Sequence, residues 1–181
     1  MANNRKELIN SIKAFLDSEE KCMLITGTHQ YQKHMVTIAV LNKYLPGAHV
    51  LFRTNAMQNL TESSFLGELI DKQPKMGQRF RIENNVYEAD TFNNKGSWHK
   101  TSYDLDVAII YPIDAIVRGS VKMDCIDDLF RDKDIKKIFL ISWTDAGYDY
   151  SVLDRYVDRH AVFDAEEEDL EYHKRVLGYD E

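Results

Sequence analysis

The sequence is poor in cysteine, and its composition is otherwise ordinary. Among 181 residues it has two cysteines, Cys22 and Cys125. Two are too few for a disulfide scaffold or a zinc site built from thiolates, so both are expected to be small core residues. Hydrophobic residues make up 44% and charged residues 29%, which excludes disordered, collagen-like and coiled-coil classes. A chain of this length buries roughly 70% of its unfolded surface on folding, which is enough to stabilise one domain without disulfide bonds or a structural metal.

Long hydrophobic runs and excess positive charge are also lacking. No apolar run approaches the ~20 residues that cross a bilayer, and MANNRKELINSIKAFL lacks the unbroken apolar core of a signal peptide. Lysine and arginine total 23 against 30 acidic residues, a net charge of −7. Autonomous binding of nucleic acid needs a positive field, so we do not expect it. We expect a reduced, cytoplasmic protein without a membrane segment.

Short apolar runs alternate with helical patterns along the chain. The runs lack polar alternation and predict strands covered on both faces, at 22–26, 50–52, 107–110, 138–141 and 161–163. Helices are expected at 4–20, 34–45, 55–70, 114–131, 149–159 and 165–177, the last with a capping box from Asp164 and Glu167. This alternation predicts an α/β fold: one three-layer domain over 1–181, with a mostly parallel sheet of about five strands.

The segment 71–102 differs from its surroundings, with six cationic and four acidic residues. Apolar residues around Asn84 and Asn85 predict a hairpin near 79–92, an insertion or edge hairpin too short for its own core. Cations interleaved with aromatics suit the stacking of single-stranded nucleic acid, although covering a sheet edge is the favoured interpretation. The candidate nucleic-acid contacts in this segment are Arg79, Arg81, Lys95 and Trp98.

A candidate ligand loop follows the first predicted strand. Ligands of open parallel sheets bind beyond the carboxyl ends of the strands. The loop there reads Gly27-Thr28-His29-Gln30-Tyr31-Gln32-Lys33-His34. Its length and position fit a phosphate-binding loop, G-x-x-x-x-G-K-[ST], in which backbone amides and the lysine hold phosphates. Gly27 and Lys33 match this pattern, whereas Gln32 replaces the second glycine and His34 replaces the hydroxyl residue.

The chain here resembles the P-loop NTPase superfamily, and more specifically the first RecA-like lobe of helicase-type ATPases. Motifs in similar order cover about residues 20–165. Arg53-Thr54-Asn55 is similar to the motif that touches the nucleic-acid backbone, and the strand ending in Ile110 is similar to a Walker B strand. Ser142-Trp143-Thr144 is similar to the S-A-T motif that couples the nucleotide to a neighbouring lobe.

The resemblance implies a role for each matching residue. ATP or another nucleotide would bind at 27–34, with Lys33 neutralising the phosphates and the backbone of Thr28 to Gln32 cradling them. Asp114 would be the carboxylate on the metal side, and Thr144 would sense the γ-phosphate. Arg53 would contact nucleic acid, although a salt bridge is the favoured interpretation of this arginine.

Departures from the family pattern argue against hydrolysis and against bound Mg²⁺. Gln32 places a side chain where phosphates approach the backbone, and His34 offers nitrogen to an ion that prefers oxygen. Tyr111-Pro112 stands where the Walker B acids belong. We therefore expect a degenerate nucleotide-binding module with at most weak ATPase activity alone. It would be an accessory or sensing subunit of a nucleic-acid-handling assembly.

Two other functions remain open from the sequence. The first is a non-enzymatic interaction domain that binds a protein partner or a second copy through the hairpin and the acidic 164–171 stretch. The second is a metal-dependent nuclease using Asp106 and Asp134-Ile135-Lys136, by analogy with an acid followed by D/E-x-K. The 134–136 segment is expected to precede its strand.

Overall fold

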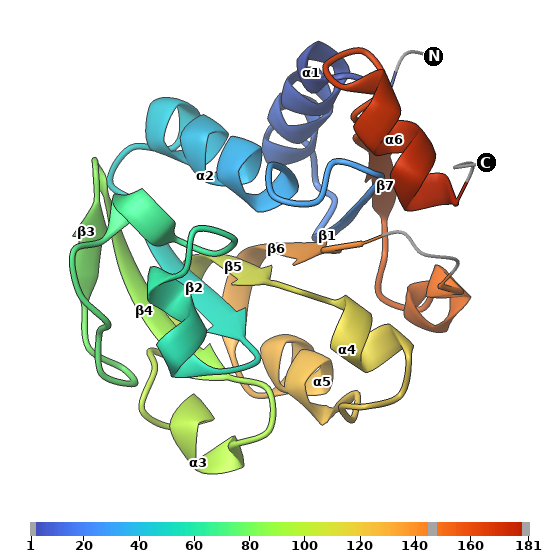
Figure 1. Ribbon diagram of the computed structural model, residues 1–181. Coiled ribbons are helices and arrows are strands. Elements are labelled where there is room, and N and C mark those ends of the chain that lie inside the picture. The colour runs from blue at the N-terminus through green and yellow to red at the C-terminus, as the bar shows by residue number, and fades with distance from the viewer. Residues whose placement is uncertain (1–2, 145–147, 179–181) are drawn as a thin grey trace.

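A seven-stranded sheet forms the centre of the computed structural model, which describes residues 3–144 and 148–178. The strand order is β3-β4-β2-β5-β6-β1-β7 (Figure 1). All neighbouring strands run parallel except β3 and β4. The predicted α/β class with a mostly parallel sheet is confirmed, with seven strands rather than about five.

The elements follow the predicted alternation. The strands are β1 (Cys22–Thr26), β2 (His49–Thr54), β3 (Phe80–Ile82), β4 (Asn85–Thr91), β5 (Asp104–Ile110), β6 (Asp134–Ile141) and β7 (Arg159–Val162). The α-helices are α1 (Arg5–Leu16), α2 (Lys33–Tyr44), α3 (Lys95–Trp98), α4 (Asp114–Val117), α5 (Asp124–Arg131) and α6 (Leu170–Leu177). Short 3₁₀ helices are η1 (Met57–Thr61), η2 (Gly67–Leu69) and η3 (Tyr150–Leu153).

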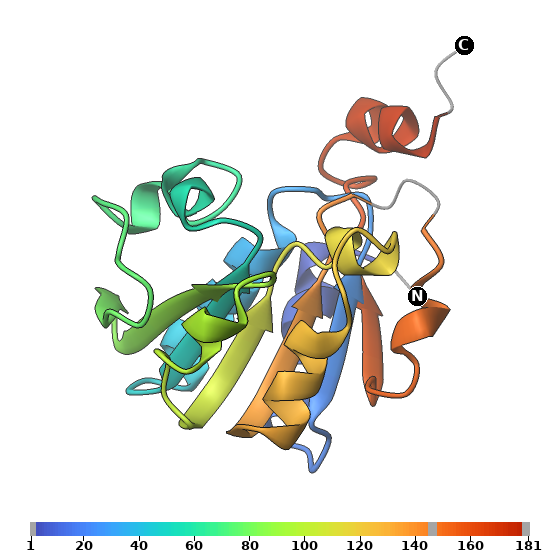
Figure 2. The same cartoon turned by 90° about the horizontal axis from the view of Figure 1, so that it is seen from below.

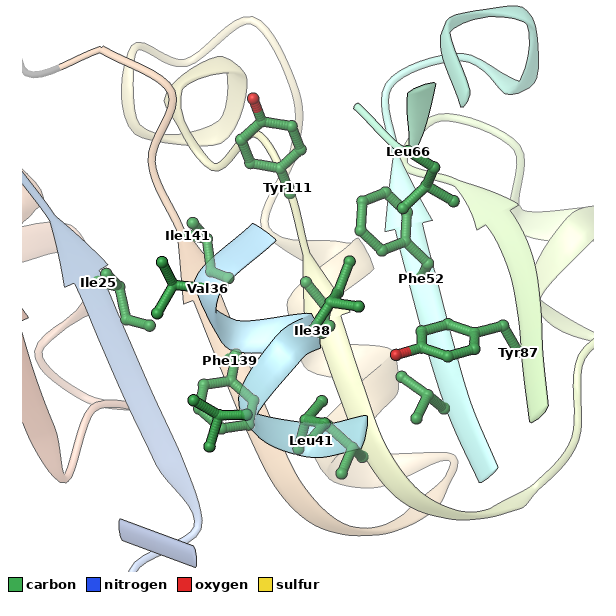
Figure 3. Close-up of a cluster of buried hydrophobic side chains, with 14 of the residues drawn as sticks. Ile25, Val36, Ile38, Leu41, Phe52, Leu66, Tyr87, Tyr111, Phe139 and Ile141 are labelled. Atoms are coloured by element: carbon green, nitrogen blue, oxygen red, sulfur yellow. The ribbon is translucent and has the colours of Figure 1, made fainter. Parts of the chain in front are cut away.

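Helices cover both faces of the sheet, which explains why its central strands are apolar throughout (Figures 1 and 2). On one face, Val36 and Leu41 of α2 pack with Phe139 of β6 in the cluster drawn in Figure 3. On the other face, α5 packs against β5 and β6 through residues that include Cys125. Both cysteines are buried and free, as the sequence predicts. No helix within 3–144 or 148–178 combines the length and apolar character needed to cross a membrane.

Two predicted helices are interrupted. The segment 55–70 forms η1 and η2 instead of one helix, and Gly67, the first residue of η2, adopts a φ of +40°. Serine and threonine in this stretch also favour turns over helix. The segment 114–131 forms α4 and α5, separated at Gly119, which has a φ of +82°. Left-handed backbone cannot continue an α-helix, so the chain turns at both glycines.

Two later helices are shorter than predicted because tertiary contacts hold the chain. Within 149–159 only η3 is helical, and the Asp158 carboxylate accepts hydrogen bonds from the backbone N–H groups of Lys21 and Cys22 at 2.8 and 2.9 Å. The last helix, α6, begins at residue 170 rather than near 165. Asp169 caps it, because the carboxylate of the predicted cap, Asp164, accepts from Thr28 instead.

The predicted hairpin near 79–92 is confirmed as β3 and β4, and it lies at one edge of the main sheet, next to β2. β4 pairs in parallel with β2 over six residues of each strand, from His49↔Val86 to Thr54↔Thr91. The segment therefore extends the main sheet, and the short β3 forms its edge.

The strand order decides which loops meet. Because β6 lies between β1 and β5, the carboxyl ends of these three strands are neighbours. The segments that follow them are 27–32, 111–113 and 142–144. The nucleotide site predicted from the sequence would lie at this edge of the sheet.

Candidate functional site

Lys33, the first residue of α2, turns its side chain inward. It is fully buried, and its ammonium donates hydrogen bonds to the carbonyl oxygens of Gly27 (2.6 Å), His29 (3.1 Å) and Trp143 (3.3 Å). Two of these carbonyls belong to the loop after β1, and the third follows β6. The ammonium therefore links the ends of two neighbouring strands.

Gly27 is required because another segment of the same backbone approaches it closely. Its φ of +121° lies in a region that L side chains rarely adopt. A Cβ at this position would lie 2.1 Å from the carbonyl oxygen of Phe163, the residue after β7. The close approach of these two segments accounts for the glycine without any bound phosphate.

Residues 163–178, here called the C-terminal arm, contact the first half of the loop. The backbone N–H of Thr28 donates to Asp164 Oδ1 at 3.0 Å, and that of His29 donates to the Phe163 carbonyl at 3.2 Å. Thr28 Oγ1 accepts from the Ala165 N–H and lies 2.7 Å from His173 Nδ1. Two loop amides that could face a phosphate therefore bind oxygens of the arm.

Glu168 adds charge to this contact. Its carboxylate lies 2.8 Å from Arg5 Nε and 2.7 Å from His29 Nε2. The hydrogen bond from Arg5, and then that from His29, lower the pKa of Glu168 to about 2, so the carboxylate stays charged at neutral pH. The pairing of Thr26 with Val162 brings the arm here, and this register is not visible in the sequence.

Asp114 opens α4 and binds the segment after β6. Its Oδ2 accepts from the Trp143 N–H at 2.6 Å and its Oδ1 accepts from the Thr144 N–H at 3.0 Å. Burial raises the pKa of Asp114, although these two amides oppose the shift. Thr144 Oγ1 lies 3.5 Å from the same carboxylate. The two predicted catalytic candidates are thus brought together, and they bind each other.

His34 lies inside the core. Its ring stacks on Tyr111 with centroids 4.0 Å apart, and Nε2 donates to the Phe65 carbonyl oxygen at 2.6 Å. Burial lowers the pKa of His34 to about 4, so the ring is neutral at pH 7. Nδ1 is buried without a hydrogen-bond partner among the described residues. His34 therefore packs against the sheet and does not face the loop's exterior.

The outer turn of the loop is formed by Gln30, Tyr31 and Gln32. Tyr31 is 43% exposed, with its ring centroid 6.3 Å from that of Trp143. Gln32 holds the N-cap position of α2 without a side-chain capping bond, and its Oε1 lies 3.5 Å from Arg5 Nη2. In residues 3–144 and 148–178, no group of three or more His, Cys, Asp or Glu side chains is placed to hold a metal ion.

The predicted nucleic-acid contacts are scattered. Arg53 is fully buried, with Nε on Asp90 at 2.7 Å and Nη1 on Asp128 at 2.8 Å. Burial opposes its charge, but these carboxylates outweigh burial and raise the pKa of Arg53. The Trp98 ring is also buried and lies 4.8 Å from the Arg53 guanidinium. The favoured interpretation of Arg53 as a salt-bridge residue thus holds, although its partners lie in the interior.

Three other cations of this group lie at the surface. Lys95 forms an ion pair with Asp124. Arg79 and Arg81 are exposed at the outer edge strand, beside the half-buried Phe80. The structure does not gather the five predicted contacts on one face.

The residues of the nuclease hypothesis lie at the opposite, amino-terminal edge of the sheet. β6 begins at Asp134, so residues 134–136 are part of this strand and do not precede it as predicted. Lys136 Nζ pairs with Asp106 Oδ1 at 2.8 Å. Lys136 therefore neutralises Asp106, the acid that the nuclease hypothesis needs for its metal ion.

Comparisons with known proteins leave the site to be interpreted from its own geometry. No protein-family model matches the chain, and no curated protein matches its sequence.

Proposed function

We propose that this chain is a non-enzymatic interaction module in which the loop at 27–33 stabilises the domain. The observation that carries this proposal is the position of the Lys33 ammonium, which donates to carbonyl oxygens of Gly27, His29 and Trp143. A lysine that serves a phosphate must present its ammonium to an anion. Here the same group is buried and binds the backbone of two loops, as a structural residue does.

Asp114 supports the same conclusion. A carboxylate that serves a metal needs free oxygens, because Mg²⁺ is bound through oxygen atoms of the protein and of water. Both oxygens of Asp114 already accept backbone hydrogen bonds, from Trp143 and Thr144. Lys33 and Asp114 therefore hold the 142–144 segment together, and the outer surfaces of the domain are left to carry its function.

A second candidate function, nucleotide binding after displacement of the C-terminal arm, is favoured by one contact. The Thr28 amide binds the carboxylate of Asp164 at 3.0 Å. A phosphate oxygen offers the same kind of acceptor, so a nucleotide could compete for this amide. In that case the domain would be a sensor whose arm leaves the loop when the ligand binds.

Melting temperature separates the two functions. It is measured with and without millimolar ATP and Mg²⁺ for the wild-type chain, Asp164→Ala, and the matched control Asp154→Ala at an exposed aspartate. A ligand at about 100 times its Kd stabilises a fold by about 2.7 kcal/mol, a shift of several degrees. The interaction module predicts no shift in any of the three proteins.

The sensor predicts a larger shift for Asp164→Ala than for the wild type, because the Thr28 amide is then free. Asp154→Ala should match the wild type in either case. A nucleotide-dependent rise in the wild-type chain would overturn the first proposal. No rise in any protein would reject the second.

A further inference from the structure

A groove of about 520 Å³ lies between α1 and α2, the two helices drawn in blue in Figure 1. We call it the α1–α2 groove. The two helices run side by side in the same direction: Arg5 approaches Gln32 at their starts, and the Lys13 ammonium lies 4.3 Å from the Tyr44 ring centroid at their ends. The groove therefore follows most of the length of α2, about 18 Å for twelve residues.

The floor of the α1–α2 groove is apolar. Its apolar residues come from both helices and are Ile9, Met35, Val36, Ala39 and Val40. The α2 positions recur every three or four residues and form one stripe along the helix. Ala39 is exposed, and Tyr44 at the end of the stripe is 45% exposed. Such a stripe is complementary to the apolar face of another helix laid along it.

The charge of the groove is opposite to that of the chain. Its charged lining residues are Arg5, Lys13 and Lys43, and no carboxylate from residues 3–144 or 148–178 lines it, whereas the chain carries a net charge of −7. Arg5 is paired with Glu168, but within the described residues no ion pair joins Lys13 or Lys43 to a carboxylate. Both ammonium groups lie near the Tyr44 ring, at 4.3 and 5.7 Å from its centroid. The hydrogen bond from Lys13, with the nearby charges of both lysines, lowers the pKa of Tyr44.

We propose that the α1–α2 groove binds an acidic amphipathic helix of a partner protein. The helix would lay leucine-like residues on the apolar floor and direct carboxylates to Lys13 and Lys43 at one end. The apolar floor favours a helix over nucleic acid. The phosphates of a nucleic acid would meet the cations Lys13 and Lys43 only at one end of the groove. The inference rests on the proposed interaction function and names the chemistry of the partner.

A displayed library of helical peptides, with one face randomised, tests this inference. It is selected on the full wild-type chain and counter-selected on Ala39→Arg, which places a long cation on the exposed floor. We expect enrichment of peptides with apolar residues at i, i+3, i+4 and i+7 and with glutamate or aspartate near one end. Enrichment of basic or unpatterned peptides, or none specific to the wild-type groove, would overturn the proposal.

The best enriched peptide is then labelled, and its affinity is measured by fluorescence anisotropy. Reversing both lysines, Lys13→Glu with Lys43→Glu, should weaken binding at least tenfold, and replacing the peptide's acids by lysine should restore it. The matched control, Lys72→Glu with Lys122→Glu, changes the net charge equally at exposed sites outside the groove and should leave affinity unchanged. An equal loss of peptide affinity in both double variants would show that binding depends on general charge attraction, and would reject the groove as the binding site.

Two further measurements separate the alternatives. Sedimentation of the wild type and of Ala39→Arg tests for self-association. A wild-type dimer that is lost in Ala39→Arg would show that a second copy of this chain occupies the groove, and would reject the partner helix. Binding of a single-stranded oligonucleotide that is lost in the Lys13 and Lys43 variant would equally reject a protein helix. The ATP melting test on the same preparations reports on the proposed function alone, so its failure is distinguishable from failure of the groove.

Discussion

The ammonium of Lys33 lies 2.6 Å from the carbonyl oxygen of Gly27, so the two residues that match a phosphate loop are bonded to each other. This hydrogen bond joins the first residue after β1 to the first residue of α2, on the buried side of the loop between them. Its donor and acceptor are both buried, where a hydrogen bond to a charged group is worth about 1.5–3 kcal/mol. The match to the loop pattern is therefore accompanied by a stabilising role that needs no ligand.

Lys33→Met should destabilise the domain. The variant keeps an apolar stem of similar length but leaves three backbone carbonyls without this donor, so we expect the free energy of unfolding to fall by about 2–4 kcal/mol. Urea denaturation measures the change. Lys43→Met, at an exposed position of the same helix, is the control and should stay within about 0.5 kcal/mol of the wild type. Equal stability of Lys33→Met and the control would contradict the structural role.

The buried His34 should make stability depend on pH. The pKa of its imidazole is about 4 in the folded chain, below the ordinary value of 6.5. The unfolded chain therefore binds this proton first, and stability present above pH 6.5 is lost as pH falls toward 4, by about 2–3 kcal/mol in total. Urea denaturation at several pH values in this window measures the loss.

His34→Gln keeps a donor for the Phe65 carbonyl and removes the titrating group, so its stability should change less over the same window. His99→Gln removes an exposed histidine and should follow the wild-type curve. If His34→Gln keeps the full wild-type pH dependence, other groups are responsible for it.

Arg53→Met should be among the more destabilising single changes. It leaves Asp90 and Asp128 without their cation in the interior, and breaking a buried ion pair costs about 3–5 kcal/mol. Thermal or urea unfolding measures this loss, and Arg79→Met, at an exposed arginine, should change stability by less than about 0.5 kcal/mol. A loss below about 1 kcal/mol for Arg53→Met would show that the two acids find other partners.

Two glycines allow a matched test of close approach. Gly27→Ala places a Cβ 2.1 Å from the Phe163 carbonyl oxygen. We expect the free energy of unfolding to fall by more than about 3 kcal/mol. Gly119 also has a positive φ, +82° against +121° at Gly27, but nothing lies within 4 Å of an added Cβ. Gly119→Ala should therefore lower the free energy of unfolding by only about 1–2 kcal/mol, the cost of the left-handed backbone. Unfolding free energies of the two variants give the comparison. Equal losses would mean that the backbone angle alone requires glycine at residue 27.

Elements that bury an apolar run were predictable from the sequence. The five consecutive apolar or small residues of β1 were predicted with the observed bounds, because a strand covered on both faces needs no polar alternation. Helix lengths were less predictable. The 165–177 segment has acids suited to a helix start at Asp164, but the Thr28 amide takes that carboxylate, and a contact between residues so far apart leaves no local pattern.

The chain's own residues determined the α/β class and the loop that joins β1 to α2, because periodicity and apolar runs act locally. Only tertiary structure decided what the loop does. Parallel pairing of β1 with β6 and β7 brings Trp143 and Phe163 beside Gly27 and Lys33, so the charged groups find protein partners at that edge. Two of the carbonyls that Lys33 binds, those of Gly27 and His29, are local in the sequence, but the third, that of Trp143, comes from 110 residues away. Folding brings this distant carbonyl within hydrogen-bond range of the ammonium, and no local pattern predicts it.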